Sequence, residues 1–93
     1  MSMVLFDFAK SFVLGRMDAR VFSEAYMEIW KIERDRGILR EDAASLSECL
    51  SSIFCFADMY SEDADARQYF ELDEAGLLGR VCEEINKVEK VSI

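Results

Sequence analysis

Apolar residues recur every three or four positions along most of the chain, which is the spacing of one face of an α-helix. Residues 3–14 carry such a stripe, and Gly15 follows as a residue that commonly ends a helix. Asp18 then offers a side-chain N-cap for a second helix, which Gly37 ends. The stripe of the first helix contains Leu5, Phe8 and Phe12, and it is widened by Val4, Ala9 and Val13. The buried face of the second is predicted to contain Phe22, Ala25, Tyr26, Ile29 and Ile32.

A third helix is predicted to start near Asp42 and to end near Tyr60. Asp42 is one candidate N-cap, and Ser45 with Glu48 forms a second candidate, a capping box. The predicted apolar stripe of this helix contains Leu46, Cys49, Leu50, Ile53, Phe54 and Ala57.

A fourth helix is predicted from Asp73, its N-cap, to about Val91. Gly76 and Gly79 fall in its first turns, where glycine weakens a helix. We interpret them as a flat patch that lets a neighbouring helix come close. The predicted apolar stripe contains Leu77, Leu78, Val81, Ile85 and Val88.

The chain of 93 residues has no proline and only four glycines, which favours long helices over a many-turned β fold. Two of the three connections between the predicted helices are short, so consecutive helices should run antiparallel. The third, residues 61–72, is longer than a helix pair requires. The sequence therefore predicts an all-α fold, an antiparallel four-helix bundle that forms a single domain over 1–93, with a long acidic loop between helices 3 and 4.

Most of the excess negative charge lies in and around this third connection. The whole chain has a net charge of −8, and residues 58–74 combine seven carboxylates with one base, Arg67. Three aromatic residues, Tyr60, Tyr69 and Phe70, lie among the acids. Rings in a solvated loop usually need cover, so we predict that Phe70 anchors the loop on the bundle and that Arg67 braces the carboxylates. The acids are Asp58, Glu62, Asp63, Asp65, Glu71, Asp73 and Glu74.

Several classes of function are disfavoured by the composition. The chain has no histidine and no glycine-rich phosphate loop, so we expect neither an enzyme nor a bound cofactor or metal. Three cysteines without a CxxC pair, and an N-terminus unlike a secretion signal, favour the cytoplasm. No apolar run is long enough to cross a bilayer, so no membrane partner is expected.

A calcium site in the acidic segment is an alternative. Asp63, Asp65 and Glu74 match positions 1, 3 and 12 of an EF-hand loop. Arg67 stands at position 5, where a ligand oxygen belongs, and Gln68 at position 6, where the sharp turn requires glycine. For Asp73 and Glu74, a local role at the positive end of a helix dipole is a further alternative to binding.

A fixed cluster of carboxylates creates a negative field that attracts basic partners and speeds their encounter. Basic surfaces in cells are above all nucleic-acid-binding sites, while nucleic acid itself is repelled. The sequence thus favours a small acidic inhibitor of a nucleic-acid-handling protein. The alternative is a helical adaptor or nucleic-acid mimic that regulates a host factor.

The sequence also resembles the colicin D immunity protein family, small cytoplasmic proteins that protect a bacterium from its own toxin. The resemblance is carried by the run IFCFADMYSEDADARQYFELDEAGL, with FSEAYMEIW upstream, and extends from about Phe22 to Val88. Its elements are an aromatic helix end at Tyr60, the pair Asp63 and Asp65 with Arg67 after it, and a Glu-Leu-Asp-Glu lead into the fourth helix. The immunity proteins of the DNase colicins fit poorly, because they carry a Tyr-Tyr-Pro element and this chain has no proline.

The resemblance implies a four-helix bundle that binds the C-terminal domain of a toxin, a nuclease that cleaves tRNA. Its acidic surface would cover the basic cleft that holds the tRNA, with one immunity protein for each toxin. Similar proteins accompany S-type pyocins and contact-dependent inhibition toxins. Carried over to this chain, the toxin-binding residues are Asp58, Tyr60, Glu62, Asp63, Asp65, Tyr69, Glu71 and Asp73.

Overall fold

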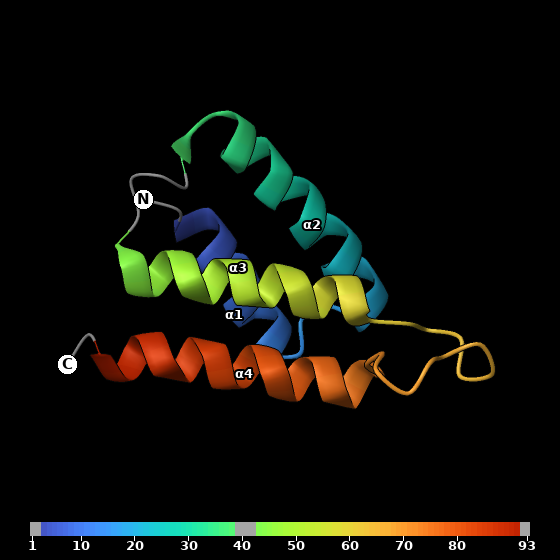
Figure 1. Ribbon diagram of the computed structural model, residues 1–93. Coiled ribbons are helices and arrows are strands. Elements are labelled where there is room, and N and C mark those ends of the chain that lie inside the picture. The colour runs from blue at the N-terminus through green and yellow to red at the C-terminus, as the bar shows by residue number, and fades with distance from the viewer. Residues whose placement is uncertain (1–2, 39–42, 92–93) are drawn as a thin grey trace.

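The computed structural model describes residues 3–38 and 43–91, which form four α-helices and no strand of a sheet (Figure 1). The predicted all-α fold is therefore confirmed. No helix within these residues has the length and apolar character needed to cross a membrane. The helices are α1 (Met3–Val13), α2 (Ala19–Asp35), α3 (Ala44–Met59) and α4 (Glu74–Val91).

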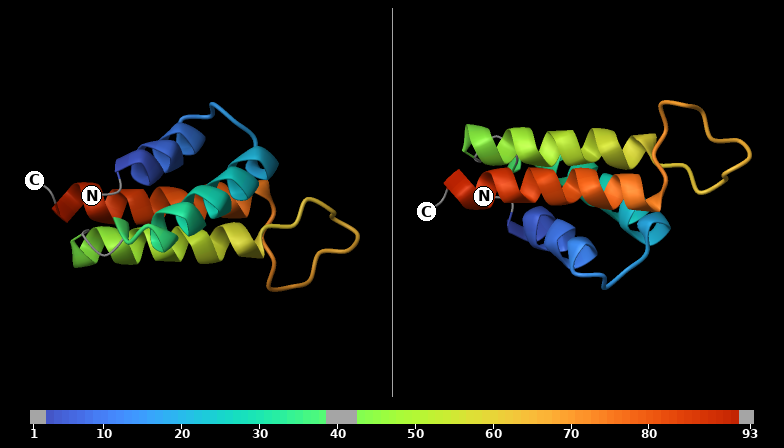
Figure 2. Two further views of the ribbon diagram at one scale, coloured as in Figure 1. Left: turned by 90° about the horizontal axis from the view of Figure 1, so that it is seen from above. Right: turned by 90° about the horizontal axis from the view of Figure 1, so that it is seen from below.

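Successive helices run in roughly opposite directions, as predicted. Helices α3 and α4 lie side by side, while α2 crosses α3 at an angle and α1 packs against both α2 and α4 (Figures 1 and 2). The long connection between α3 and α4 projects from one end of the bundle (Figure 2). It therefore extends away from the helices that hold it.

The core is built around a row of aromatic rings from α1 and α2. The rings of Phe12 and Phe22 stack with centroids 4.3 Å apart, and Tyr26 follows 5.3 Å from Phe22. Tyr26 is fully buried, and its hydroxyl donates a hydrogen bond to the Leu50 carbonyl oxygen at 2.7 Å. This bond satisfies the polar end of a large buried side chain and joins α2 to α3. The other buried core residues are Leu5, Phe6, Ala9, Ala19, Leu46, Cys49, Ile53, Leu77, Val81 and Ile85.

Two predicted helix caps are confirmed. Asp18 Oδ1 accepts a hydrogen bond from the Val21 N–H at 2.8 Å, and Asp73 Oδ1 accepts one from the Gly76 N–H at 2.7 Å. Each carboxylate satisfies an N–H group that has no partner inside its helix. These caps set the starts of α2 and α4.

The cap of α3 differs from the prediction. Its N-cap is Ala43, which makes no side-chain hydrogen bond. Ser45 and Glu48 lie inside the helix, so the predicted capping box is wrong, and Asp42 lies outside the described residues. The C-terminal end at Tyr60 is confirmed.

Three residues of the predicted apolar stripes are exposed. Val4 on α1 is 66% exposed. Ile32 is 55% exposed, and Glu33 beside it is buried. Figure 1 shows α2 diverging from α3 towards its C-terminal end, so the stripe there no longer faces the core. Leu78 on α4 is 37% exposed, because its helical position turns it away from the buried Leu77.

The glycines of α4 do not form a contact patch for another helix, so that interpretation is wrong. A Cβ atom on Gly79 would meet nothing within 4 Å. On Gly76 it would lie 3.1 Å from Asp73 Oδ1 and 3.4 Å from Leu72 Cδ2. Gly76 thus makes room for the N-cap of its own helix.

Candidate functional site

The acidic loop, residues 60–73, is closed at its base by backbone hydrogen bonds. The Ser61 N–H donates to the Leu72 carbonyl at 2.9 Å, and the Leu72 N–H donates to the Met59 carbonyl at 2.8 Å. Tyr60 and Leu72 pair as an isolated parallel bridge. The two ends of the loop are therefore held together, and the residues between them form a projection with a fixed base (Figure 2).

Arg67 ties the loop across its middle. Its Nε and Nη2 atoms donate to the Ser61 carbonyl oxygen at 3.1 Å and 2.8 Å. The prediction that Arg67 braces the carboxylates is wrong about the partner, since the structure shows no ion pair for Arg67 within residues 3–38 and 43–91. The guanidinium of Arg67 is hydrogen-bonded to a backbone carbonyl and pairs with no carboxylate of the loop. The negative electrostatic field of the loop acids is therefore left for a partner.

Two of the predicted contact residues shape the loop through their side chains. Asp63 Oδ1 accepts hydrogen bonds from the N–H groups of Asp65 at 3.0 Å and Ala66 at 3.3 Å, which is an Asx-type turn. Glu71 Oε1 accepts from the Gln68 N–H at 2.8 Å. Both acids thus have a structural role in the loop.

Further carboxylates connect the base of the loop to the start of α2. Glu74 Oε1 accepts a hydrogen bond from the Ala19 N–H at 3.0 Å, so a residue of α4 caps a donor of α2. Glu62 lies 3.7 Å from Arg20 in an exposed ion pair, which contributes little stability. The contact between Glu74 and Ala19 joins residues 55 positions apart, and no local pattern reveals it.

Tyr60 and Leu72 anchor the loop, instead of the predicted Phe70. Both pack half-buried against the core, whereas Phe70 is 55% exposed. Partial burial raises the pKa of the Tyr60 phenol, and the carboxylates of Glu62 and Glu74 raise it further. Tyr60 therefore stays neutral at physiological pH, with acids around it.

Tyr69 and Phe70 project from the loop. The Glu71 N–H donates to the Gln68 carbonyl at 3.0 Å, which makes the two rings the central residues of a β-turn. Tyr69 is 99% exposed, and its ring and that of Phe70 meet edge to face with centroids 5.5 Å apart. The turn explains why Phe70 does not reach the bundle.

Asp58 and Asp65 are exposed, and neither carboxylate has a hydrogen-bond or ion-pair partner in the described part of the chain. Asp58 lies on α3 and borders a hollow of about 200 Å³ between α2 and the loop base. Glu24, which the sequence did not single out, also borders this hollow. The hollow is lined by Arg20, Ser23, Glu24, Met27, Ala57, Asp58, Tyr60 and Glu62.

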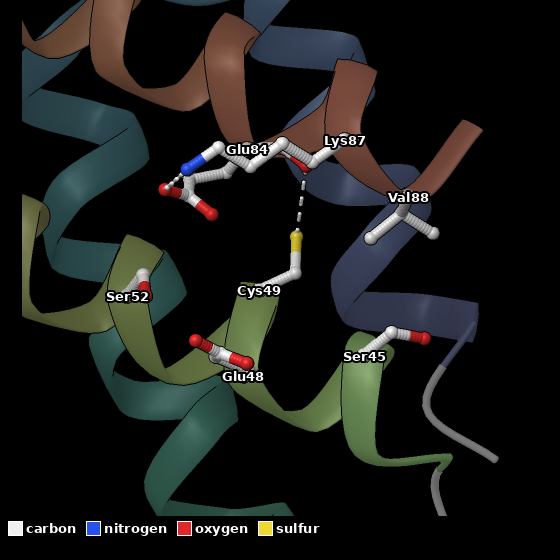
Figure 3. A pocket seen from close by; sticks show the side chains of 7 residues that line it. All are labelled: Ser45, Glu48, Cys49, Ser52, Glu84, Lys87 and Val88. Atoms are coloured by element: carbon white, nitrogen blue, oxygen red, sulfur yellow. Dashed lines mark hydrogen bonds and ion pairs between the residues drawn. The ribbon is translucent and has the colours of Figure 1, made fainter. Parts of the chain in front are cut away.

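A second hollow, of about 240 Å³, lies between α3 and α4 and contains none of the predicted site residues (Figure 3). The Cys49 thiol there donates to the Glu84 carbonyl at 3.5 Å, and the Glu84 carboxylate pairs with Lys87 at 3.2 Å. Burial raises the pKa of the Cys49 thiol to about 12, and the Glu84 carboxylate adds to the rise. A protonated thiol is a poor nucleophile, so this hollow offers no reactive cysteine.

The calcium alternative is not supported by the geometry. Glu74, which would be the bidentate ligand, turns to the N-terminus of α2 instead. Asp63 binds backbone N–H groups. Within residues 3–38 and 43–91 no three acidic or cysteine side chains gather as a metal site.

A small helical bundle that holds a closed, negatively charged loop with two outward aromatic rings has the features of a protein that binds another protein. The chain matches the family described as bacterial self-protective colicin-like immunity over residues 1–88, and it belongs to that family. It is therefore an immunity protein, whose partner is a cognate toxin protein. No curated protein sequence matches the chain.

Proposed function

We propose that this protein neutralises a ribonuclease toxin that cleaves tRNA, by covering the basic active-site cleft of the toxin with the acidic loop. The observation that supports the proposal most is the loop itself, a projection closed at its base that presents carboxylates outward. A nuclease must hold phosphates with Lys and Arg side chains, so its cleft attracts such a surface.

The negative charge of the loop and of the adjacent end of α3 is available to a partner. Asp58 and Asp65 have no side-chain partner in the described residues, and Arg67 is occupied by the Ser61 carbonyl. The ion pair of Glu62 with Arg20 is long and exposed, and a cation of the toxin can replace it. The field of this end of the bundle thus remains strongly negative.

The loop is also ordered before it binds. The hydrogen bonds of Arg67, Asp63 and Glu71 already give it one shape. Ordering a flexible loop on binding costs free energy, and a preformed loop avoids most of that cost. High affinity is therefore compatible with a short contact segment.

We assign eight toxin contacts, with two kinds of role. Asp58, Glu62 and Asp65 are exposed carboxylates that face the partner directly. The other acids of the set accept backbone hydrogen bonds that shape the loop and its junction with α4. The two tyrosines lie next to the carboxylates. The full set is Asp58, Tyr60, Glu62, Asp63, Asp65, Tyr69, Glu71 and Asp73.

In this proposal the chain performs no catalysis of its own and requires no cofactor. It binds one toxin domain and excludes the RNA from the cleft. The place of action is the cytoplasm, where tRNA is located. The proposal assigns the chain no contact with nucleic acid, because the phosphates would be repelled.

An inhibition assay tests the proposal directly. The purified chain is mixed with the nuclease domain of the toxin encoded beside it, and cleavage of total tRNA is followed on a gel. Equimolar immunity protein should abolish cleavage, while an unrelated ribonuclease in the same buffer stays active. Undiminished cleavage by the toxin would overturn the proposal.

A further inference from the structure

The aromatic pair Tyr69 and Phe70 has no role in holding the bundle together. Tyr69 is 99% exposed and Phe70 55%, and they contact each other edge to face. Large exposed apolar side chains of this kind mark interaction surfaces. Aromatic side chains also lose little rotamer entropy on binding, because they have only two rotatable bonds.

The pair is held in a defined position relative to the loop carboxylates. The β-turn that presents the rings is closed by two hydrogen bonds between Gln68 and Glu71. Arg67, next to this turn, binds the Ser61 carbonyl at the loop base. Rings and carboxylates therefore approach a partner together, as one preformed surface.

The RNA-binding site of a nuclease has features that are complementary both to the carboxylates and to the aromatic rings of the loop. It binds phosphates with cations, and it stacks unpaired bases on flat aromatic or guanidinium surfaces. Carboxylates suit the first kind of subsite. The flat faces of Tyr and Phe rings suit the second, since stacking of π-faces tolerates different ring types.

Resting on the proposed function, we infer that Tyr69 and Phe70 occupy the base-stacking subsite of the toxin, as substitutes for RNA bases. The loop thus copies both parts of the RNA, with carboxylates in place of phosphates and rings in place of bases. Charges act over distance and set the association rate. The rings act only in contact and set the dissociation rate.

The first experiment compares dissociation rates of complexes with the toxin nuclease domain. The variants are Tyr69→Ala with Phe70→Ala, the ring-preserving Tyr69→Phe, and Ile32→Ala as control. Ile32 is exposed to the same extent as Phe70 but lies on α2 outside the loop. The double variant should dissociate roughly 10- to 100-fold faster, as expected for hot-spot residues, with its association rate little changed. Tyr69→Phe and Ile32→Ala should behave like the wild type.

The second experiment separates a base subsite from any other apolar pocket. Trinucleotides with uncharged methylphosphonate linkages present bases without phosphate charge, and they are added to each complex. They should weaken the wild-type complex and leave the complex of the double variant unaffected. Absence of this competition would overturn the inference that the rings replace bases.

The outcomes distinguish this inference from the proposed function. If the wild type inhibits tRNA cleavage but the double variant dissociates at the wild-type rate, the inference fails and the function stands. If the wild type does not inhibit, the function itself fails. Circular dichroism of each variant confirms that the helices are retained.

Discussion

Arg67 and Ser61 are joined by two hydrogen bonds from one guanidinium to one carbonyl oxygen, at 2.8 Å and 3.1 Å. The contact spans the acidic loop and leaves the loop's cation on the backbone. The contact therefore fixes the shape of the loop without neutralising any of its carboxylates.

Replacing Arg67 by Gln should loosen the loop without unfolding the helices. The free energy of unfolding should change by less than about 0.5 kcal/mol, because the contact lies outside the core. Backbone N–H groups of residues 61–67 should exchange faster with solvent, which hydrogen-exchange mass spectrometry measures. Arg16→Gln, with the same charge change in another connection, should leave this exchange unaltered. If the N–H groups of residues 61–67 exchanged equally slowly in Arg67→Gln and Arg16→Gln, the hydrogen bonds of Arg67 to Ser61 would not be what holds the loop.

Neutralising Asp58 and Asp65 together by Asn should slow association with the toxin. Neither carboxylate has a described partner, so the change removes charge and leaves the fold intact. We expect the association rate at low salt to fall roughly three- to tenfold and its salt dependence to become shallower. Stopped-flow mixing at several salt concentrations measures both. Asp7→Asn on α1 is the control, and an equal effect there would show that the position of the charge at the loop end of the bundle is irrelevant.

Tyr26→Phe should lower the free energy of unfolding by about 1 kcal/mol, through loss of the hydrogen bond to Leu50. The Leu50 carbonyl keeps its helical partner, so the cost stays modest. Tyr26→Ala also removes the ring from the core and should cost about 3–5 kcal/mol. Urea denaturation measures both values. If Tyr26→Phe were as unstable as Tyr26→Ala, the buried ring would contribute nothing beyond the hydrogen bond, and the prediction would be wrong.

The helix caps predict changes of opposite sign. Asp73→Ala should lower the stability by about 1 kcal/mol, because the Gly76 N–H loses its acceptor. Ala43→Ser should raise it by about 0.5–1 kcal/mol, because α3 lacks a side-chain cap and Ala43 already has the non-helical backbone angles of an N-cap, φ −58° and ψ 149°. Thermal unfolding of the two variants beside the wild type provides the measurement. A destabilised Ala43→Ser variant would show that the N-cap of α3 is another residue.

Cys49 should make the stability depend on pH in the alkaline range. Burial raises the pKa of its thiol from 9.0 to about 12 in the folded chain. Between these values the unfolded chain releases the proton and the folded chain retains it, so the free energy of unfolding falls as pH rises. Below pH 9 the contribution is fully present. The stability difference between the wild type and Cys49→Ala should therefore shrink from about pH 9 upward in urea titrations, and a constant difference would contradict the shift.

The sequence was sufficient for most of the helix boundaries. Asp18 and Asp73 act within three residues of the N–H groups they cap, so a local pattern identifies them. The sequence failed at Ile32, because the angle at which α2 leaves α3 is a property of helix packing. The sequence also could not show whether Gly76 and Gly79 face solvent or a neighbouring helix.

For the candidate site, composition located the acidic loop but not the roles of its residues. Phe70 and Tyr60 are both aromatic residues beside acids, and only the bridge between Tyr60 and Leu72 decides which of them faces the core. The partner of Arg67 was likewise undecidable, since a guanidinium in a loop rich in carboxylates has many candidate acceptors. The geometry selected a backbone carbonyl.

The sequence by itself determined the helices, the caps of α2 and α4 and the position of the excess charge, because these depend on residues a few positions apart. The tertiary structure alone decided which side chains point outward. It placed Glu74 against Ala19 and Tyr26 against Leu50, and it turned Tyr69 and Phe70 to solvent. The physical reason is that burial and direction depend on how helices meet in space, and contacts between distant segments leave no periodic trace along the chain.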